Sequence, residues 1–198
     1  MTKLYYPSTE RNREPILAVL QQELPASGLL VEVAAGSGEH ALFFSRRFPQ
    51  LQWQATDPQV EALESIAAWR EEEGSDNLLP PLELDASARQ WPIDGADAIL
   101  CVNMTHISPP AATEGLFAAA GRLLPPGGPL VIYGPFVEAD FETTASNLEF
   151  DASLKSRDPS WGLRDVAWLD QLAAGSGLER KARHAMPTNN LTLVYRHK

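Results

Sequence analysis

The chain has 198 residues, of which 44% are hydrophobic and 21% are charged, and its formal net charge is −10. This size and composition are typical of one globular domain, and the acidic balance disfavours a nucleic-acid partner, because phosphate backbones are bound by basic surfaces. No apolar stretch reaches the roughly 18 residues that a membrane span needs, and the lone Cys101 cannot close an intramolecular disulfide. We therefore expect one domain over residues 1–198, located in the cytoplasm and without a membrane partner.

Strand and helix patterns alternate along the chain. Apolar runs of strand length stand between segments whose apolar residues recur at helical spacing. The alternation indicates an α/β fold with a doubly wound, mostly parallel sheet, which binds ligands at the carboxyl ends of its strands. Predicted in chain order are a strand at 29–34, a helix at 39–48, a strand at 51–56, a helix at 59–74, strands at 80–85 and 96–104, a helix at 111–124, a strand at 129–136 and a helix at 163–174.

The end of the chain predicts a closing antiparallel hairpin, because residues 189–198 alternate between two faces and follow the segment 178–186, which would form the other strand. The helix at 59–74 is predicted to bury one face, to which helical spacing assigns Val60, Leu63, Ile66 and Ala67.

The polar segment 135–161 follows a strand at the expected ligand edge. It is longer than most connections inside compact domains, which indicates a functional role. Within it, Ser146 and Glu149 match a capping box, so we expect a helix to begin there.

The turn around Gly36-Ser37-Gly38 separates the first strand from the first of these predicted helices. Such a turn brings unpaired backbone N–H groups close to a ligand. One candidate ligand is a dinucleotide, whose pyrophosphate sits on a helix N-terminus and whose ribose meets an acid such as Asp57. The other is S-adenosylmethionine, which shares the ribose but carries a cationic methionine end. Glu32, inside the first strand, favours the cationic ligand, although bonding to the turn backbone is a structural alternative for it.

The segment VEVAAGSGEH at 31–40 resembles motif I of the class I S-adenosylmethionine-dependent methyltransferases, with Ala34 where a glycine is commoner. With ERNREPIL, ILCVNMTHISP, LVIYGPF, SNLEFDASLKSRDPSWGLRD and MPTNNLTLVYR, it is similar to the methyltransferase-like 26 family over nearly the whole chain. The resemblance implies a single domain with a class I methyltransferase Rossmann-like fold, and S-adenosyl-L-methionine as its cofactor.

The class I pattern also implies roles for residues at the strand ends. Asp57 resembles the acid that binds the ribose hydroxyls, and Asp85 with Ala86 resembles the pair that meets the adenine ring. Turn formation by Asp57 and helix capping by Asp85 are the structural alternatives. An N-terminal segment of this kind can fold over the cofactor as a lid, so Arg11 and Asn12 are candidates for the methionine carboxylate or the substrate, with solvated helix-start positions as the alternative. The cofactor-binding residues expected on this basis are Asn12, Glu32, Ala34, Gly36, Gly38, Asp57, Asp85, Ala86 and Asn103.

Candidate catalytic and substrate groups lie on other segments. A histidine ordinarily titrates near neutral pH, and His106 follows the fourth strand while Tyr133 ends the fifth, so we consider both for proton transfer, with core packing as the alternative. The segment KSRDPSWG mixes charges with an aromatic ring, which suits a small zwitterionic ligand; an Arg-Asp pair that fixes a turn is the alternative. The expected catalytic residues are His106 and Tyr133, and the expected substrate residues are Arg11, Asn147, Arg157, Asp158, Trp161, Asn189 and Asn190.

We expect a methyltransferase that transfers the methyl group directly to a small polar metabolite. A one-step displacement needs an aligned acceptor and the exclusion of water more than it needs a catalytic triad. The four histidines show no metal-ligand spacing, so no metal is expected. The alternatives are a methyltransferase-like domain that binds a ligand or a protein without turnover, and an NAD(P)-binding oxidoreductase.

Overall fold

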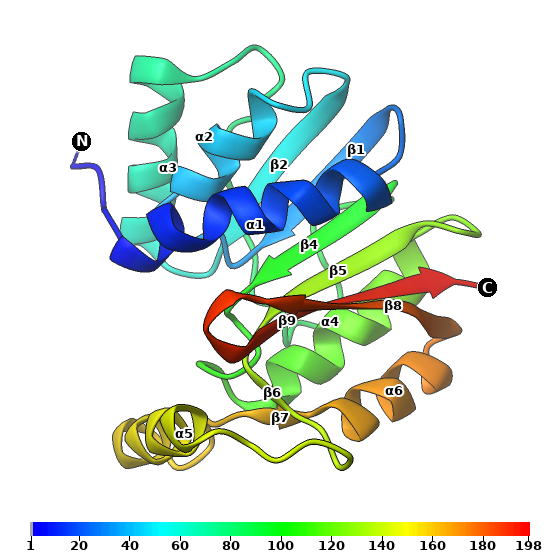
Figure 1. The fold of residues 1–198 in the computed structure, drawn as a ribbon. Coiled ribbons are helices and arrows are strands. Elements are labelled where there is room, and N and C mark those ends of the chain that lie inside the picture. Colours follow the sequence, from blue (N-terminus) through cyan, green and yellow to red (C-terminus); the bar gives the residue numbers. More distant parts are fainter. Residues whose placement is uncertain (1) are drawn as a thin grey trace.

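The computed structural model describes residues 2–198 and contains one large sheet between two layers of helices (Figure 1). The strands of this sheet are β1 (Gly28–Val33), β2 (Leu51–Asp57), β3 (Leu82–Glu83), β4 (Ala98–Val102), β5 (Pro129–Gly134), β8 (Leu178–Met186) and β9 (Asn190–His197). Their spatial order is β3-β2-β1-β4-β5-β9-β8. Strands β1 to β5 are parallel, and β9 runs antiparallel to both β5 and β8. The predicted mostly parallel sheet and its antiparallel C-terminal hairpin are confirmed.

The helices are α1 (Pro7–Glu23), α2 (Glu39–Ser45), α3 (Val60–Glu73), α4 (Pro110–Leu123), α5 (Ala145–Arg157) and α6 (Val166–Gly175). Helices α1, α2 and α3 cover one face of the sheet, and α4 and α6 cover the other (Figure 1). A 3₁₀ turn at Pro187–Asn189 joins β8 to β9. Within residues 2–198, no helix combines the length and the apolar composition that crossing a membrane requires.

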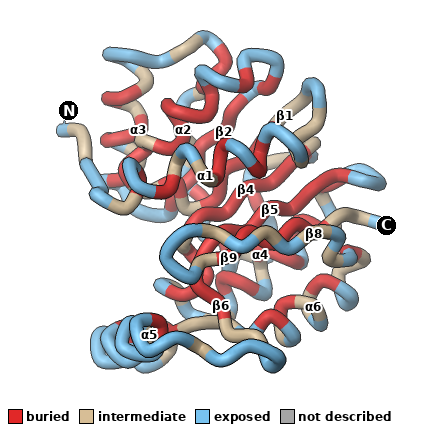
Figure 2. Tube along the Cα trace, viewed as in Figure 1, coloured by how far each residue is buried: buried red, intermediate tan, exposed pale blue. Residues whose placement is uncertain are grey.

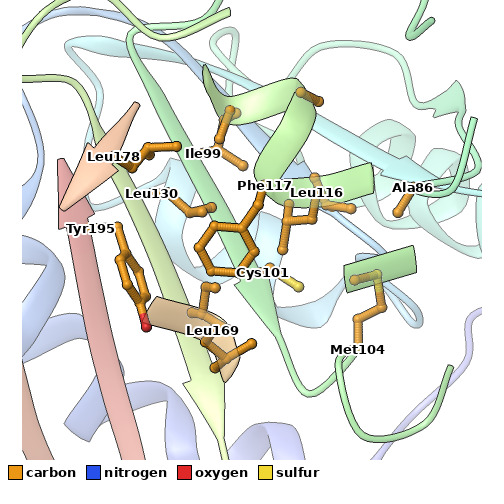
Figure 3. Packing of buried hydrophobic residues seen from close by; sticks show 14 of the residues in the cluster. Ala86, Ile99, Cys101, Met104, Leu116, Phe117, Leu130, Leu169, Leu178 and Tyr195 are labelled. Atoms are coloured by element: carbon orange, nitrogen blue, oxygen red, sulfur yellow. The ribbon is translucent and has the colours of Figure 1, made fainter. Parts of the chain in front are cut away.

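The buried residues follow the central strands and the inner faces of the helices (Figure 2). On the α4 and α6 side, the ring of Phe117 meets the ring of Tyr195 edge-on, with centroids 5.1 Å apart, and Leu169 packs in the same cluster (Figure 3). The Tyr195 hydroxyl donates to Asp170 at 2.9 Å, which satisfies its polar end. These contacts from α4 and α6 hold the C-terminal hairpin against the parallel strands.

The predicted buried face of α3 is correct at Ile66 and wrong at Val60, while Leu63 and Ala67 are half-buried. Val60 is 59% exposed, and the buried positions include Ala62, Ser65, Ile66 and Trp69. Ser65 faces inward because its hydroxyl donates to the Ser37 carbonyl at 2.7 Å and accepts from the Leu4 amide at 2.8 Å. The helix is therefore oriented by the glycine turn and the N-terminal segment, and apolar spacing alone does not show that.

The segment between β5 and α6 also differs from its prediction. β5 ends at Gly134, and Phe136–Val137 forms a separate strand β6 that pairs with β7 (Arg164–Asp165). The last helix begins at Val166 instead of 163, because the Asp165 carboxylate accepts from the Ala167 amide at 2.7 Å and caps it. The predicted capping box is wrong: α5 begins at Ala145, so Ser146 lies inside it and Thr144 is the cap position.

Candidate functional site

The turn after β1 has a left-handed backbone at three positions. The φ angles are 56° at Ala34, 57° at Gly36 and 86° at Gly38. The Asp57 carboxylate fastens this turn to the end of β2, because it accepts from the Gly36 amide at 2.9 Å and from the Gln59 amide at 3.0 Å. The structural role considered for Asp57 is thus present, and its carboxylate also faces the site described next.

The two glycines of the turn serve different contacts. A Cβ atom on Gly38 would lie 2.9 Å from the Ile66 Cα atom, so this glycine allows α3 to pack against the turn. A Cβ atom on Gly36 would lie 3.2 Å from the Tyr6 ring, which covers the turn from the N-terminal segment. The Tyr6 amide donates to the Glu39 carboxylate at 2.7 Å and holds that segment in place.

A first hollow of about 810 Å³ opens beyond the carboxyl ends of β1, β2 and β3. Five of the nine predicted cofactor residues line it: Ala34, Gly36, Asp57, Asp85 and Ala86. The rest of its lining is largely apolar and includes Val33, Leu84, Val102, Met104, Ile107 and Ala112.

The two acids of this hollow differ in their surroundings. Burial raises the pKa of the Asp57 carboxyl, against the lowering effect of its hydrogen bonds from Gln59 and Gly36. Asp85 is exposed, and one of its oxygens accepts from the amide and the hydroxyl of Ser87 at 2.8 and 2.7 Å. No helix directly follows Asp85, so the helix-capping alternative is wrong: its carboxylate fixes a turn with Ser87, and Asp85 also borders the hollow.

Glu32 lies beneath the turn and lines neither of the two hollows described here. It is 1% exposed and accepts from the Trp53 indole N–H at 2.7 Å. Burial raises its pKa to about 8, and nearby Asp57 adds to the rise while the Trp53 hydrogen bond opposes it. The sequence predicted a cationic ligand or the turn backbone as the partner of Glu32, and Trp53 was not anticipated. Both side chains lie in the layer between the sheet and α2, a relation that strand register alone could have suggested.

A second hollow of about 670 Å³ adjoins the first, since Ile107 lines both. It gathers residues from α1, the turn after β4, the end of β5, α5 and the turn between β8 and β9. Eight predicted residues line it: Arg11, Asn12, Asn103, His106, Tyr133, Asn147, Asn189 and Asn190.

His106 is buried in the wall of the second hollow. Its Nδ1 atom has no hydrogen-bond partner among residues 2–198, and its ring packs edge-on against Phe150 at 5.7 Å. Burial lowers its pKa to about 4, and the Arg164 guanidinium adds to the shift. The imidazole is therefore neutral at neutral pH and can accept a hydrogen bond.

Tyr133 stands beside His106 in the lining of the same hollow. Burial raises the pKa of its hydroxyl, and the side chains of Asn12 and Arg11 act in the opposite direction. Asn12 is in turn fixed from α2, because its Oδ1 atom lies 2.8 Å from the His40 Nε2 atom. The second hollow is thus lined by the un-ionised Tyr133 hydroxyl and by the Asn12 amide, whose orientation is fixed by His40.

Four predicted site residues lie elsewhere. Glu32 lies in β1 and bonds Trp53, and Gly38 belongs to the turn but packs against Ile66 of α3 instead of lining a hollow. Arg157 and Asp158 line neither hollow: the Asp158 carboxylate accepts from Ser160, and the Arg157 guanidinium lies 5.0 Å from the centre of the Trp161 ring. Trp161 itself lines the first hollow, beside the predicted cofactor residues.

Sequence reasoning missed several wall residues, including Tyr6, Ile107 and Phe150. They carry no chemical signal, but all three are large hydrophobic side chains that remain more than a third exposed. Among residues 2–198, no group of three or more His, Cys, Asp and Glu side chains is placed to hold a metal ion.

Solved methyltransferase structures share this fold. An O-methyltransferase family protein from Burkholderia thailandensis aligns with a TM-score of 0.80 and 18% identity, over 96% of this chain and 57% of that one. An O-methyltransferase family 2 protein from Planctomyces limnophilus DSM 3776, in complex with apigenin, aligns with a TM-score of 0.78 and 21% identity, over 96% of this chain and 60% of that one. Human N-acetylserotonin methyltransferase, in complex with SAM, aligns with a TM-score of 0.76 and 14% identity, over 96% of this chain and 52% of that one. The chain thus spans little more than half the length of these proteins.

A family model matches residues 3–197, which is nearly the whole chain. Its description is "Protein of unknown function (DUF938)". The finer resemblance to the methyltransferase-like 26 family stays a prediction. The chain belongs to the DUF938 family and has the fold of class I methyltransferases.

Proposed function

We propose that this protein is an S-adenosylmethionine-dependent methyltransferase that acts on a small polar molecule. The observation that carries the proposal is the junction of two hollows at the carboxyl edge of the sheet. One has the glycine turn and the strand-end acids expected for an adenosine, and the other has polar side chains suited to an acceptor. The SAM complex of the human structural neighbour supports the choice of cofactor.

In this proposal the first hollow holds the adenosine. Asp57 accepts from the ribose hydroxyls, while its hydrogen bonds to Gly36 and Gln59 keep the carboxylate in position. Asp85 and the Ala86 amide meet the adenine ring, and the apolar lining contacts its faces. Asn12 and Asn103 line the second hollow near the junction, where the methionine end is expected.

When bound, S-adenosylmethionine would supply an electrophilic methyl group to a lone pair on the acceptor, with neutral S-adenosylhomocysteine as the leaving group. The chain's part is to align the acceptor and exclude water. An oxygen acceptor that still carries its proton becomes strongly acidic on methylation. Neutral His106 can receive that proton despite its low pKa, and the Tyr133 hydroxyl can orient the acceptor.

Calorimetry tests the cofactor. S-adenosylhomocysteine is expected to bind with measurable heat, whereas NADH is expected to give none. Absence of heat with millimolar S-adenosylhomocysteine, or tight binding of NADH, would refute the proposal.

Incubation with methyl-labelled S-adenosylmethionine and a metabolite extract tests turnover. Label is expected to move into a small product in the presence of the wild-type protein. A protein that binds S-adenosylhomocysteine but never transfers label would instead be a non-catalytic binding domain.

A further inference from the structure

The second hollow has the opposite charge character to the rest of the molecule. The protein carries a formal net charge of −10, yet the described residues that line this hollow include no Asp or Glu. Its one fully charged side chain is Arg11. The first hollow, by contrast, is bordered by Asp57, Glu61 and Asp85.

Arg11 is free to meet a ligand. It lies on the exposed side of α1, and among residues 2–198 its guanidinium has no hydrogen-bond or ion-pair partner. The next arginine along the helix, Arg13, instead packs over the Phe43 ring at 4.8 Å. A guanidinium at the rim of a hollow without competing carboxylates attracts anions, and its planar donors match a carboxylate.

The remaining lining limits the size and shape of such an anion. Asn147 donates to the Asn189 carbonyl at 3.1 Å, which ties α5 to the turn between β8 and β9. Phe150 and Pro135 contribute apolar surface, while His106 and Tyr133 contribute uncharged polar atoms. A single guanidinium balances one negative charge, so the lining suits a monoanion with an apolar or aromatic body better than a phosphate dianion.

We propose that the methyl acceptor is a small organic monocarboxylate whose carboxylate pairs with Arg11 in the second hollow. This inference rests on the proposed function in one respect: it takes the second hollow as the acceptor site. The carboxylate anchors the acceptor, and a separate atom of the same molecule faces the methyl group.

Matched ligand pairs test the charge requirement. The probes are 4-hydroxybenzoate against 4-hydroxybenzamide and phenylacetate against phenylacetamide, titrated by NMR with and without saturating S-adenosylhomocysteine. In the wild type each acid is expected to bind about fivefold or more tightly than its amide, because charge-assisted hydrogen bonds are stronger than neutral ones. Arg11→Gln is expected to remove the preference, and Arg11→Lys to restore part of it. Arg89→Gln is the control, because Arg89 is exposed and lines neither hollow.

Equal binding of acid and amide in the wild type would overturn the inference, as would a preference that survives Arg11→Gln. If Arg11→Gln weakened S-adenosylhomocysteine as much as the acids, Arg11 would serve the methionine carboxylate and the inference would also fail. A wild type that binds no S-adenosylhomocysteine would refute the proposed function and with it the acceptor role, whereas the acid preference, measured without that ligand, separately tests carboxylate binding by Arg11.

Discussion

The two hollows are built in different ways. The first is formed mainly by the segments that directly follow β1, β2, β3 and β4, with acids and a glycine at the ends of the first three strands. The second is assembled from α1, the turns after β4 and β5, α5 and the β8–β9 turn, which are far apart in the chain. The comparison indicates that the cofactor side follows from the repeating strand-turn-helix pattern, whereas the acceptor side depends on tertiary packing.

Both hollows nevertheless concentrate backbone strain. Among residues 2–198, the non-glycine residues with positive φ are Ala34, Asn103, Thr188 and Asn189, and each lines one of the hollows. Such conformations cost free energy and persist where the surrounding structure holds them, which is a common property of ligand sites. The strain therefore supports a functional role for both sites.

The largest expected effect concerns the turn under the first hollow. Gly38→Ala combines a left-handed backbone with a Cβ atom against the Ile66 backbone, so we expect the free energy of unfolding to fall by about 2–4 kcal/mol. Gly127→Ala is the matched control, because Gly127 has a φ of 80° but no atom near its added Cβ. Urea denaturation measures both variants. Equal losses of unfolding free energy in the two variants would show that close packing of α3 against Gly38 does not contribute.

Next in size is the effect of Asp57 on cofactor affinity. Asp57→Ala removes a charge-assisted acceptor, and S-adenosylhomocysteine should bind more weakly by about 1–3 kcal/mol. The acid preference of the second hollow should stay unchanged, which separates the two sites. Asp94→Ala, at an exposed position outside both hollows, controls for lost negative charge. Unchanged affinity in Asp57→Ala would remove this residue from the site.

Glu32 and His106 should change the slope of the unfolding free energy against pH in opposite directions. The pKa of Glu32 is raised to about 8, chiefly by burial. Its contribution to the free energy of unfolding is therefore complete below pH 4.5 and is lost as pH rises toward 8. The pKa of His106 is lowered to about 4, so its contribution is complete above pH 6.5 and is lost as pH falls toward 4. Each group changes the free energy of unfolding by up to about 1.4 kcal/mol per pH unit.

Denaturation of Glu32→Gln and His106→Gln between pH 4.5 and 6.5 measures how the free energy of unfolding changes with pH. The first substitution should make stability rise more steeply with pH than in the wild type, and the second should make it rise less steeply. Trp53 and Asp57 face Glu32, and Arg164 faces His106, so these partners must be kept intact. Two profiles parallel to the wild type would contradict the burial of both groups.

The smallest expected effect is a release of strain. Ala34→Gly should raise the free energy of unfolding by about 0.5–1 kcal/mol, since glycine adopts a φ of 56° without a Cβ clash. Asn103→Gly should gain less, because asparagine tolerates the left-handed region better than alanine does. Thermal denaturation compares the two. A larger gain at Asn103 would mean that strain is greater on the acceptor side.

Local patterns were enough to predict much of the cofactor side. The strand-helix alternation predicted the parallel sheet, and the glycine turn with Asp57 and Asp85 predicted which strand ends border the first hollow. These residues lie directly after the strands that position them, so residue type and spacing in the sequence are enough to predict their place in the site. Local patterns misplaced Val60 on α3 and missed the inward position of Ser65, which is held by contacts with the turn and the N-terminal segment.

By itself, the sequence determined the order of the seven sheet strands and of helices α2, α3, α4 and α6, and the turn that follows β1, because backbone preferences and apolar periodicity are local. Only the tertiary structure decided that Glu32 meets Trp53, that Arg157 and Asp158 stay outside the hollows, and that Arg11 borders a pocket free of carboxylates. Those outcomes depend on burial and on long-range packing, which bring together side chains separated by tens of residues and set their charge states.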